Sequence, residues 1–176
     1  IRDRSYNSIR KNLGYRHEIC WADDFSDDGT WEWMQEIAEK DKNVKIHRNE
    51  GPTRLGHTIL YDTLINEYAT NDIVMIYHAD MYACPGMDEE VLKHLERGKV
   101  VSATRIEPPL HPDGPEKILK DYGIEPEEFD EMGLLKFLEE DKHGEDKITN
   151  GVFAPWAIYK DDFLAIGGHD PLYAPQ

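Results

Sequence analysis

The sequence has 176 residues, 39% of them hydrophobic and 10% aromatic, which is enough to build one sizeable core and fits a single domain. Its 36 acidic residues outnumber 20 Lys and Arg, for a net charge of −16. A surface of that sign repels phosphate backbones and anionic lipid headgroups, so the charge argues against nucleic-acid binding. Four Trp, nine Tyr and five Phe argue equally against disorder.

The chain carries no sign of a membrane span or of export. Its longest apolar run, residues 73–77, is far short of the ~20 residues that a spanning helix needs, and its start does not resemble a signal peptide. Cys20 and Cys84 are too few for a disulfide scaffold, so we expect reduced, buried thiols in a cytoplasmic protein. We also expect the chain to be truncated at both ends. The sequence does not indicate whether the protein is a monomer or an oligomer.

The first part of the chain predicts a strand, a helix and a second strand. The apolar run 17–22 predicts a strand that stops at Asp23 and Asp24. Apolar positions at helical spacing predict a helix over 31–40. Alternation over 44–47 then predicts a short, half-buried strand.

The strongest helical stripe of the sequence covers residues 55–68. The run 73–77 that follows is apolar without alternation, which is typical of a strand buried on both faces in a parallel sheet. Further apolar patterns predict a helix over 88–95 and a strand over 100–104.

The alternation of predicted strands and helices then ends. Residues 107–146 are rich in Pro, Gly and acidic side chains and predict a long excursion with one helix over 129–138. Regularity returns with a strand over 152–159 and a helix over 161–166. The alternation of strands and helices predicts an α/β fold with a mostly parallel sheet.

Polar residues follow two of the predicted strands, where open α/β sheets bind their ligands. Asp23 and Asp24 follow the first strand, and His78 and Asp80 follow the most apolar one. A carboxylate and an imidazole can together bind a divalent ion that leaves positions open for phosphate oxygens. An aspartate at a strand end can also form a turn or cap a helix, the role we favour for nearby Asp27 and Asp28.

Four segments, in this order and spacing, resemble the family 2 glycosyltransferases. They correspond to the family's strand ending in two aspartates, its next strand and Gly-containing loop, its strand with the Asp-x-Asp motif, and its acceptor-side segment ending in Gly-Gly-Phe-Asp. In this chain they read EICWADDFSDDGT, NVKIHRNEGPTRLG, IVMIYHADMYACPG and NGVFAPWAIYKDDFLAIGGHDPLY. The likeness covers most of residues 5–105 and 150–173.

The resemblance implies a GT-A fold, in which helices flank a mostly parallel sheet, and an inverting, hexosyltransferase-like enzyme. The donor would be a UDP-, GDP- or dTDP-sugar, with Mn²⁺ or Mg²⁺ bridging its diphosphate. Asp23 and Asp24 would contact base and ribose, Arg54 would lie near the base or phosphates, and Asp80 would bind the metal. Asp170 would lie beside the acceptor, which is a glycan, a lipid or a protein.

The same resemblance divides a single domain, residues 1–176, into three parts. Residues 1–104 would bind the nucleotide sugar, residues 105–149 would form an irregular acidic excursion or lid, and residues 150–176 would face the acceptor.

The chain departs from the family pattern at three points. His78 replaces the first acid of Asp-x-Asp and leaves a neutral metal ligand or a ribose contact there. His169 replaces the usual Phe of Gly-Gly-Phe-Asp, as a surface residue, an acceptor contact or a metal ligand. The family's catalytic base lies a few residues further on, which would be beyond Gln176, so Asp170 is the fallback.

Two other functions remain open at this point. A module that binds a nucleotide or a protein without catalysis would explain the replaced acid and the missing base. A sugar nucleotidyltransferase would share the sheet and the metal, but it would need a Gly-rich, basic loop near the N-terminus, which we do not find.

Overall fold

The computed structural model describes residues 2–110, 112–140, 148, 151–170 and 172. Short helices and strands succeed one another along the chain. Their bounds are α1 Arg2–Asn12, β1 Ile19–Asp24, α2 Thr30–Lys40, β2 Val44–Asn49, α3 His57–Thr63, the π-helical turn η1 Leu64–Tyr68, β3 Ile73–Ile76, α4 Met87–His94, β4 Val101–Ser102, β5 Arg105–Glu107, β6 Lys117–Leu119, the 3₁₀ turn η2 Pro126–Glu128, α5 Glu131–Glu140, β7 Trp156–Tyr159 and α6 Lys160–Ala165.

The strands form small sheets, and the class is mixed α/β as predicted. β1 and β2 pair in parallel, β3, β7 and β4 form a sheet in that order with β4 antiparallel to β7, and β5 pairs in parallel with β6. The sequence predicted one mostly parallel sheet. In the described residues, the strands instead form three separate small sheets. β3 has four residues and β4 only two, so these ladders end after few hydrogen bonds.

The chain divides into two compact units. The first unit comprises residues 1–15, 75–95 and 100–157, and the second comprises residues 16–74, 96–99 and 158–176.

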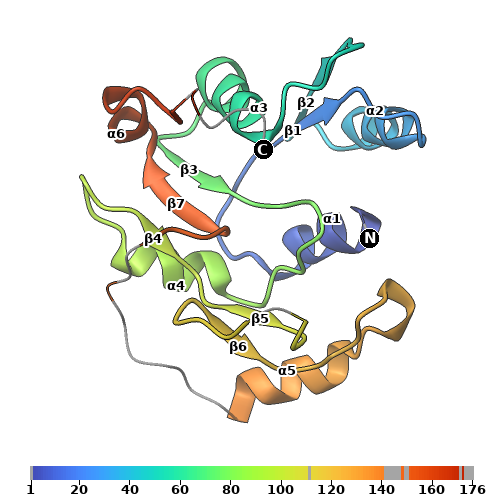
Figure 1. The fold of residues 1–176 in the computed structure, drawn as a ribbon, viewed down its shortest axis with the longest axis vertical. Coiled ribbons are helices and arrows are strands. Elements are labelled where there is room, and N and C mark those ends of the chain that lie inside the picture. The colour runs from blue at the N-terminus through green and yellow to red at the C-terminus, as the bar shows by residue number, and fades with distance from the viewer. Residues whose placement is uncertain (1, 111, 141–147, 149–150, 171, 173–176) are drawn as a thin grey trace. The chain divides into compact units, whose positions relative to one another are not determined.

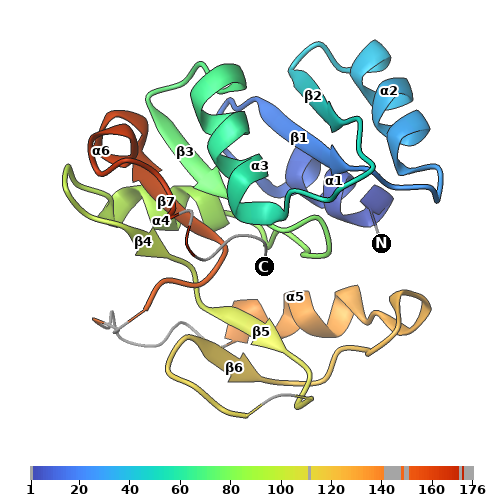
Figure 2. The same cartoon turned by 45° about the horizontal axis from the view of Figure 1, so that its top comes forward.

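In the second unit, α2 packs against β2, and α3 and η1 pack against β1. Figures 1 and 2 show α2 beside the β1–β2 pair in both views. The core of these elements consists of buried aliphatic side chains and one methionine: Ile19, Met34, Val44, Leu60, Leu64 and Ile65. The helix predicted over 31–40 is confirmed as α2, and the one predicted over 55–68 is found as α3 with its continuation η1.

The first unit contains elements that sequence patterning did not predict. α1 buries Ser5, Ser8 and Ile9, and the Ser8 hydroxyl accepts a hydrogen bond from the Ala83 amide at 2.8 Å. Two buried serines on the inner face weaken the apolar stripe by which a helix is recognised.

The strands β5 and β6 lie in and beside the segment predicted as an irregular excursion. Arg105 and Glu107 of β5 form an ion pair at 2.9 Å, and Lys117 of β6 lies 3.1 Å from Glu107. Charged side chains therefore occupy positions at which a half-buried strand usually has apolar residues. For this reason the sequence does not show the alternation by which a strand is recognised. The helix predicted over 129–138 is found as α5.

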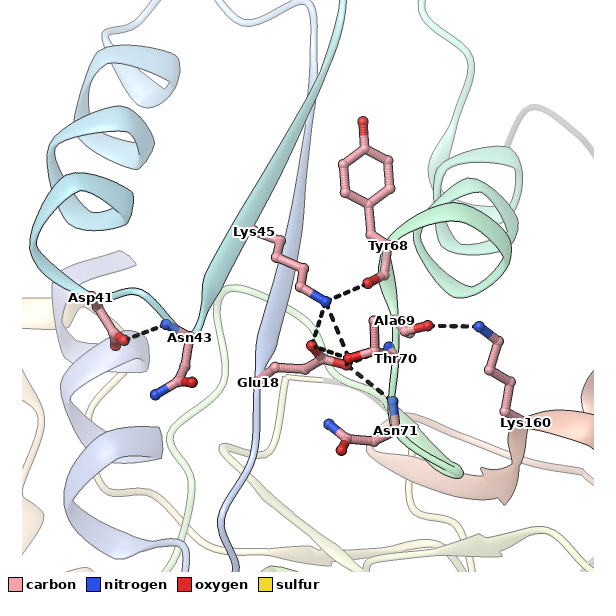
Figure 3. A network of polar contacts seen from close by, with 9 residues as sticks. All are labelled: Glu18, Asp41, Asn43, Lys45, Tyr68, Ala69, Thr70, Asn71 and Lys160. Carbon is pink, nitrogen blue, oxygen red and sulfur yellow. Dashed lines mark hydrogen bonds and ion pairs between the residues drawn. The ribbon is translucent and has the colours of Figure 1, made fainter.

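A network of polar contacts ties the loop after η1 to β1 and β2 (Figure 3). The Glu18 carboxylate lies 2.6 Å from the Lys45 ammonium and accepts hydrogen bonds from the Thr70 hydroxyl at 2.9 Å and the Asn71 amide at 3.2 Å. Lys45 also donates to the Tyr68 carbonyl at 2.7 Å. Burial opposes ionisation of Glu18, but hydrogen bonds from Lys45 and Thr70 outweigh it and lower its pKa.

We expect Glu18→Gln to lower the free energy of unfolding at pH 7 by about 1–3 kcal/mol, because it removes an ionised acceptor whose side chain is only 14% exposed. A lowered pKa in the folded state gives stability above the unfolded pKa, near 4.5, and this stability is lost as the pH falls through the folded value. Urea unfolding should therefore show the wild-type advantage shrinking below about pH 4.5.

The matched control is Glu96→Gln, since Glu96 forms an exposed ion pair with Lys99 at 2.8 Å; this variant should unfold like the wild type. A Glu18→Gln difference that is as large at pH 3 as at pH 7 would refute the role of the ionised carboxylate.

Candidate functional site

Asp23 and Asp24 are the last two residues of β1, not the first residues beyond it. Successive side chains of a strand point to opposite faces, so the two carboxylates have different surroundings. Asp23 is buried, with 2% of its surface exposed, whereas Asp24 is half-buried.

The Asp24 carboxylate holds the loop that leads into α3. One oxygen accepts from the Asn49 side chain at 2.7 Å and from the Leu55 amide at 2.9 Å, and the other accepts from the Gly56 amide at 2.9 Å. Burial opposes ionisation, but these three hydrogen bonds outweigh it and hold the pKa of Asp24 below its ordinary value. The chain entering α3 is thus fixed to the end of β1.

The Asp23 carboxylate is only partly satisfied. Its Oδ2 accepts from the Ser26 amide at 3.3 Å and lies 3.6 Å from Arg48 Nε. Its Oδ1 is buried without a hydrogen-bond partner among the described residues. A buried, unmatched carboxylate oxygen costs free energy, and it can accept a hydrogen bond from a bound molecule.

A pocket of about 440 Å³ lies in the same unit, within the size range of small-molecule sites. Its lining combines an aromatic ring, two guanidinium groups and two acids: Phe25, Ser26, Asp27, Gly29, Glu32, Arg48, Pro52 and Arg54. Arg48 lies opposite Asp23 in the parallel register and over the Trp31 ring at 5.3 Å.

Arg54, expected from the resemblance near the base or phosphates of a donor, lines this pocket, and so do Phe25 and Arg48, which the sequence did not single out. Phe25 has a left-handed backbone with φ of 59°, which is uncommon for a bulky residue. Its ring lies so close to Gly51 that a Cβ there would approach it to 2.3 Å. The parallel pairing of β1 with β2 could have pointed to Arg48, whereas no sequence pattern indicates the backbone of Phe25.

His169 and Asp170, predicted on the acceptor side, also belong to the second unit. His169 Nδ1 lies 2.6 Å from Asp62 Oδ1, and its backbone amide donates to Asp62 Oδ2 at 3.1 Å. Asp170 is exposed and accepts the Leu172 amide at 2.9 Å. Asp62 lies on α3 outside every motif, so the sequence did not indicate it.

His78 and Asp80 belong to the first unit, where they follow β3 and are exposed. The His78 carbonyl accepts the Met81 amide at 3.2 Å, which closes a turn around Asp80. Within the part of the chain that the structure describes, three or more His, Cys, Asp or Glu side chains nowhere gather as for a metal ion. An ion bound with a nucleotide takes only one or two protein ligands, because phosphate oxygens and water supply the rest.

Both cysteines are free and half-buried. Burial raises the pKa of the Cys20 thiol and that of the Cys84 thiol to about 11. Neither thiol therefore has the lowered pKa of a nucleophile.

The buried Asp23 near the end of β1 and the neighbouring pocket, lined by two guanidinium groups and two acids, form a candidate ligand site at the end of this strand. The family model described as glycosyl transferase family 2 matches residues 3–163, so the chain belongs to this family of glycosyltransferases. That membership confirms the resemblance noted from the four sequence segments. No curated protein and no solved structure gives a significant match. Among the described residues, we find no helix with the length and apolar character to cross a membrane.

We expect Asp24→Asn to lower the free energy of unfolding by about 2–3 kcal/mol. The substitution replaces one carboxylate oxygen with an NH₂ group, which then faces an N–H donor instead of accepting a hydrogen bond from it. Hydrogen exchange at the Leu55 and Gly56 amides should accelerate, since both donate to Asp24. Asp27→Asn, an exposed change in the lining of the neighbouring pocket, is the control and should alter neither measurement. Unchanged exchange at both amides in Asp24→Asn would contradict the anchoring role.

Proposed function

We propose that the chain is a metal-dependent, inverting glycosyltransferase that binds the nucleotide of its donor in the pocket lined by Phe25, Arg48 and Arg54. The observation that carries the proposal is the buried Asp23 carboxylate, whose Oδ1 has no partner among the described residues and whose Oδ2 lies beside Arg48. A nucleoside supplies N–H and O–H donors for such an oxygen, and the guanidinium groups suit its phosphates.

The pocket residues and the two aspartates that end β1 then have separate parts in donor binding. Asp23 accepts a hydrogen bond from the base or the ribose, Phe25 offers a ring for stacking, and Arg54 attracts the diphosphate. Asp24 uses both oxygens to hold the loop before α3, which supports an indirect role in donor binding through the position of Arg54.

Asp80 and His78 are the residues we propose for the metal. An exposed carboxylate and an imidazole form a donor set that suits Mn²⁺ or Mg²⁺. When bound, the ion neutralises the charge that develops on the leaving diphosphate. The protein has a net charge of −16, so without cations its field disfavours a phosphorylated ligand.

We propose a GT-A arrangement for the whole chain as one domain, with residues 105–149 acting as a lid and residues 150–176 facing the acceptor. The acceptor is a hydroxyl group of a glycan, a lipid or a protein. The two free thiols with raised pKa support a location in the reducing cytoplasm.

We expect UDP, GDP or dTDP to raise the melting temperature by about 5–11 °C at a hundredfold excess over Kd, and only with Mn²⁺ or Mg²⁺ present. Asp80→Ala should abolish this shift, whereas His78→Ala and Arg54→Ala should reduce it. Glu139→Ala, at an exposed position of α5, should keep the full shift.

The outcomes separate the parts of the proposal. An equal shift in excess EDTA would contradict the metal assignment, and no shift with any of the three nucleotides would contradict donor binding. A metal-dependent shift without turnover of any nucleotide sugar would instead indicate a module that binds nucleotides without catalysis.

A further inference from the structure

A tyrosine that follows the proposed metal ligands contacts residues from two distant parts of the chain. Tyr82 lies two residues after Asp80, and its hydroxyl donates to Glu131 Oε1 at 2.8 Å. The same hydroxyl accepts a hydrogen bond from the Asn12 side chain at 3.0 Å. The Tyr82 ring packs beside the Phe129 ring, with the two centroids 5.1 Å apart. Three segments of the first unit therefore meet at this one side chain.

Helix α1 also holds the acidic segment 125–131, which ends with the first residue of α5. This segment has five acids in seven positions, whereas α1 carries four basic side chains and one acid. Lys11 Nζ lies 3.0 Å from Glu131 Oε1, and the Arg4 guanidinium lies 5.1 Å from the centroid of the Phe129 ring. In a protein with a net charge of −16, the basic helix supplies the local cations that attract this segment.

Beyond Tyr82, the loop that follows β3 is fixed to α1. The Ala83 amide donates to the Ser8 hydroxyl at 2.8 Å, and the Ala83 carbonyl accepts from the Asn12 side chain at 2.7 Å. Ala83 is fully buried, whereas Asp80 is exposed. Tyr82 thus lies at the boundary between a fixed part of the loop and the exposed turn that carries the proposed metal ligands.

An exposed turn must lose conformational freedom when it binds an ion, and this loss weakens binding. The turn around Asp80 is closed by a hydrogen bond from the Met81 amide to the His78 carbonyl at 3.2 Å. Two hydrogen bonds and a ring contact orient Tyr82, the residue next to this turn. Groups that orient a metal ligand from outside the coordination shell typically change metal affinity by about 10- to 100-fold.

We propose that Tyr82 is a positioning residue for the metal ion: through its contact with Glu131, the acidic segment 125–131 holds the turn that carries Asp80 in the conformation that binds the ion. This inference rests on the proposed function, in which that turn supplies the metal ligands. It gives part of the proposed lid a defined task. Since coupling between two sites is reciprocal, a bound ion in turn favours the segment in this place.

The first test uses the metal-free protein. It compares the backbone amide NMR signals of residues 79–81 in the wild type, Tyr82→Phe and Glu131→Ala. The Phe side chain keeps the ring beside Phe129 and removes only the hydroxyl. We expect both variants to move these signals, although Glu131 is 49 residues away from Tyr82 in the sequence. Unmoved signals in Glu131→Ala would overturn the inference.

The second test measures Mn²⁺ affinity by electron paramagnetic resonance, with UDP, GDP or dTDP present. We expect Tyr82→Phe and Glu131→Ala to bind Mn²⁺ about tenfold more weakly than the wild type. Glu131→Gln keeps an acceptor for the tyrosine hydroxyl and should lose less affinity. The melting temperature of the metal-free variants should fall by no more than about 4 °C. A merely structural role would lower the melting temperature and leave the Mn²⁺ affinity of the folded protein unchanged.

A double variant shows whether the two residues act through their shared contact. Tyr82→Phe and Glu131→Ala remove the same hydrogen bond, so the protein with both changes should bind Mn²⁺ no more weakly than the weaker single variant. Tyr122→Phe is the matched control, because the Tyr122 ring also packs beside a phenylalanine, Phe137, with centroids 6.3 Å apart. This variant should bind Mn²⁺ like the wild type.

Two further results would overturn the inference: wild-type Mn²⁺ affinity in Tyr82→Phe, or losses that add in the double variant. Mn²⁺ binding that persists unchanged in Asp80→Ala would instead refute the proposed metal site, and with it any role of Tyr82 in metal binding. The NMR comparison needs no metal, so the contact between Tyr82 and Glu131 is tested separately from the site. The failures of the two proposals are therefore distinguishable.

Discussion

The arrangement of the second unit depends on one carboxylate, that of Asp24. It is the last residue of β1, and its oxygens accept three hydrogen bonds from Asn49, Leu55 and Gly56. These bonds determine where the chain leaves β2 and where α3 begins. The position of Arg54 follows directly, and that of Asp62 follows through α3. Arg54 in the pocket lining and Asp62 beside His169 are therefore located by the same anchor.

The sequence predicted the parts of this unit in which burial follows a regular period. The strand before the two aspartates, the helix over 31–40 and the strand at 44 alternate as β1, α2 and β2 do. It also indicated the two acids at the end of this strand as candidate ligand-binding residues. It did not separate their roles, because the distinction depends on strand pleat: Asp23 is buried beside Arg48, and Asp24 faces the loop.

Elements stabilised by polar contacts were not predictable from apolar periodicity. The charged residues of β5 and β6 pair with one another, and α1 buries two serines, so neither segment shows an apolar stripe. Asp62 was missed for a related reason. Its significance arises from a contact with His169, 107 residues further along the chain, and nothing in the local sequence of α3 indicates it.

The two half-buried cysteines have a practical consequence. With a pKa of about 11, each thiol is ionised in only about one molecule in ten thousand at pH 7, and thiolate is the form that alkylating reagents attack. A cysteine introduced on the solvent side of α2 or α5 would retain an ordinary pKa and react far faster. Fluorophores or spin labels could therefore be attached to such a position with both native cysteines left in place, and movements of each unit followed separately in solution.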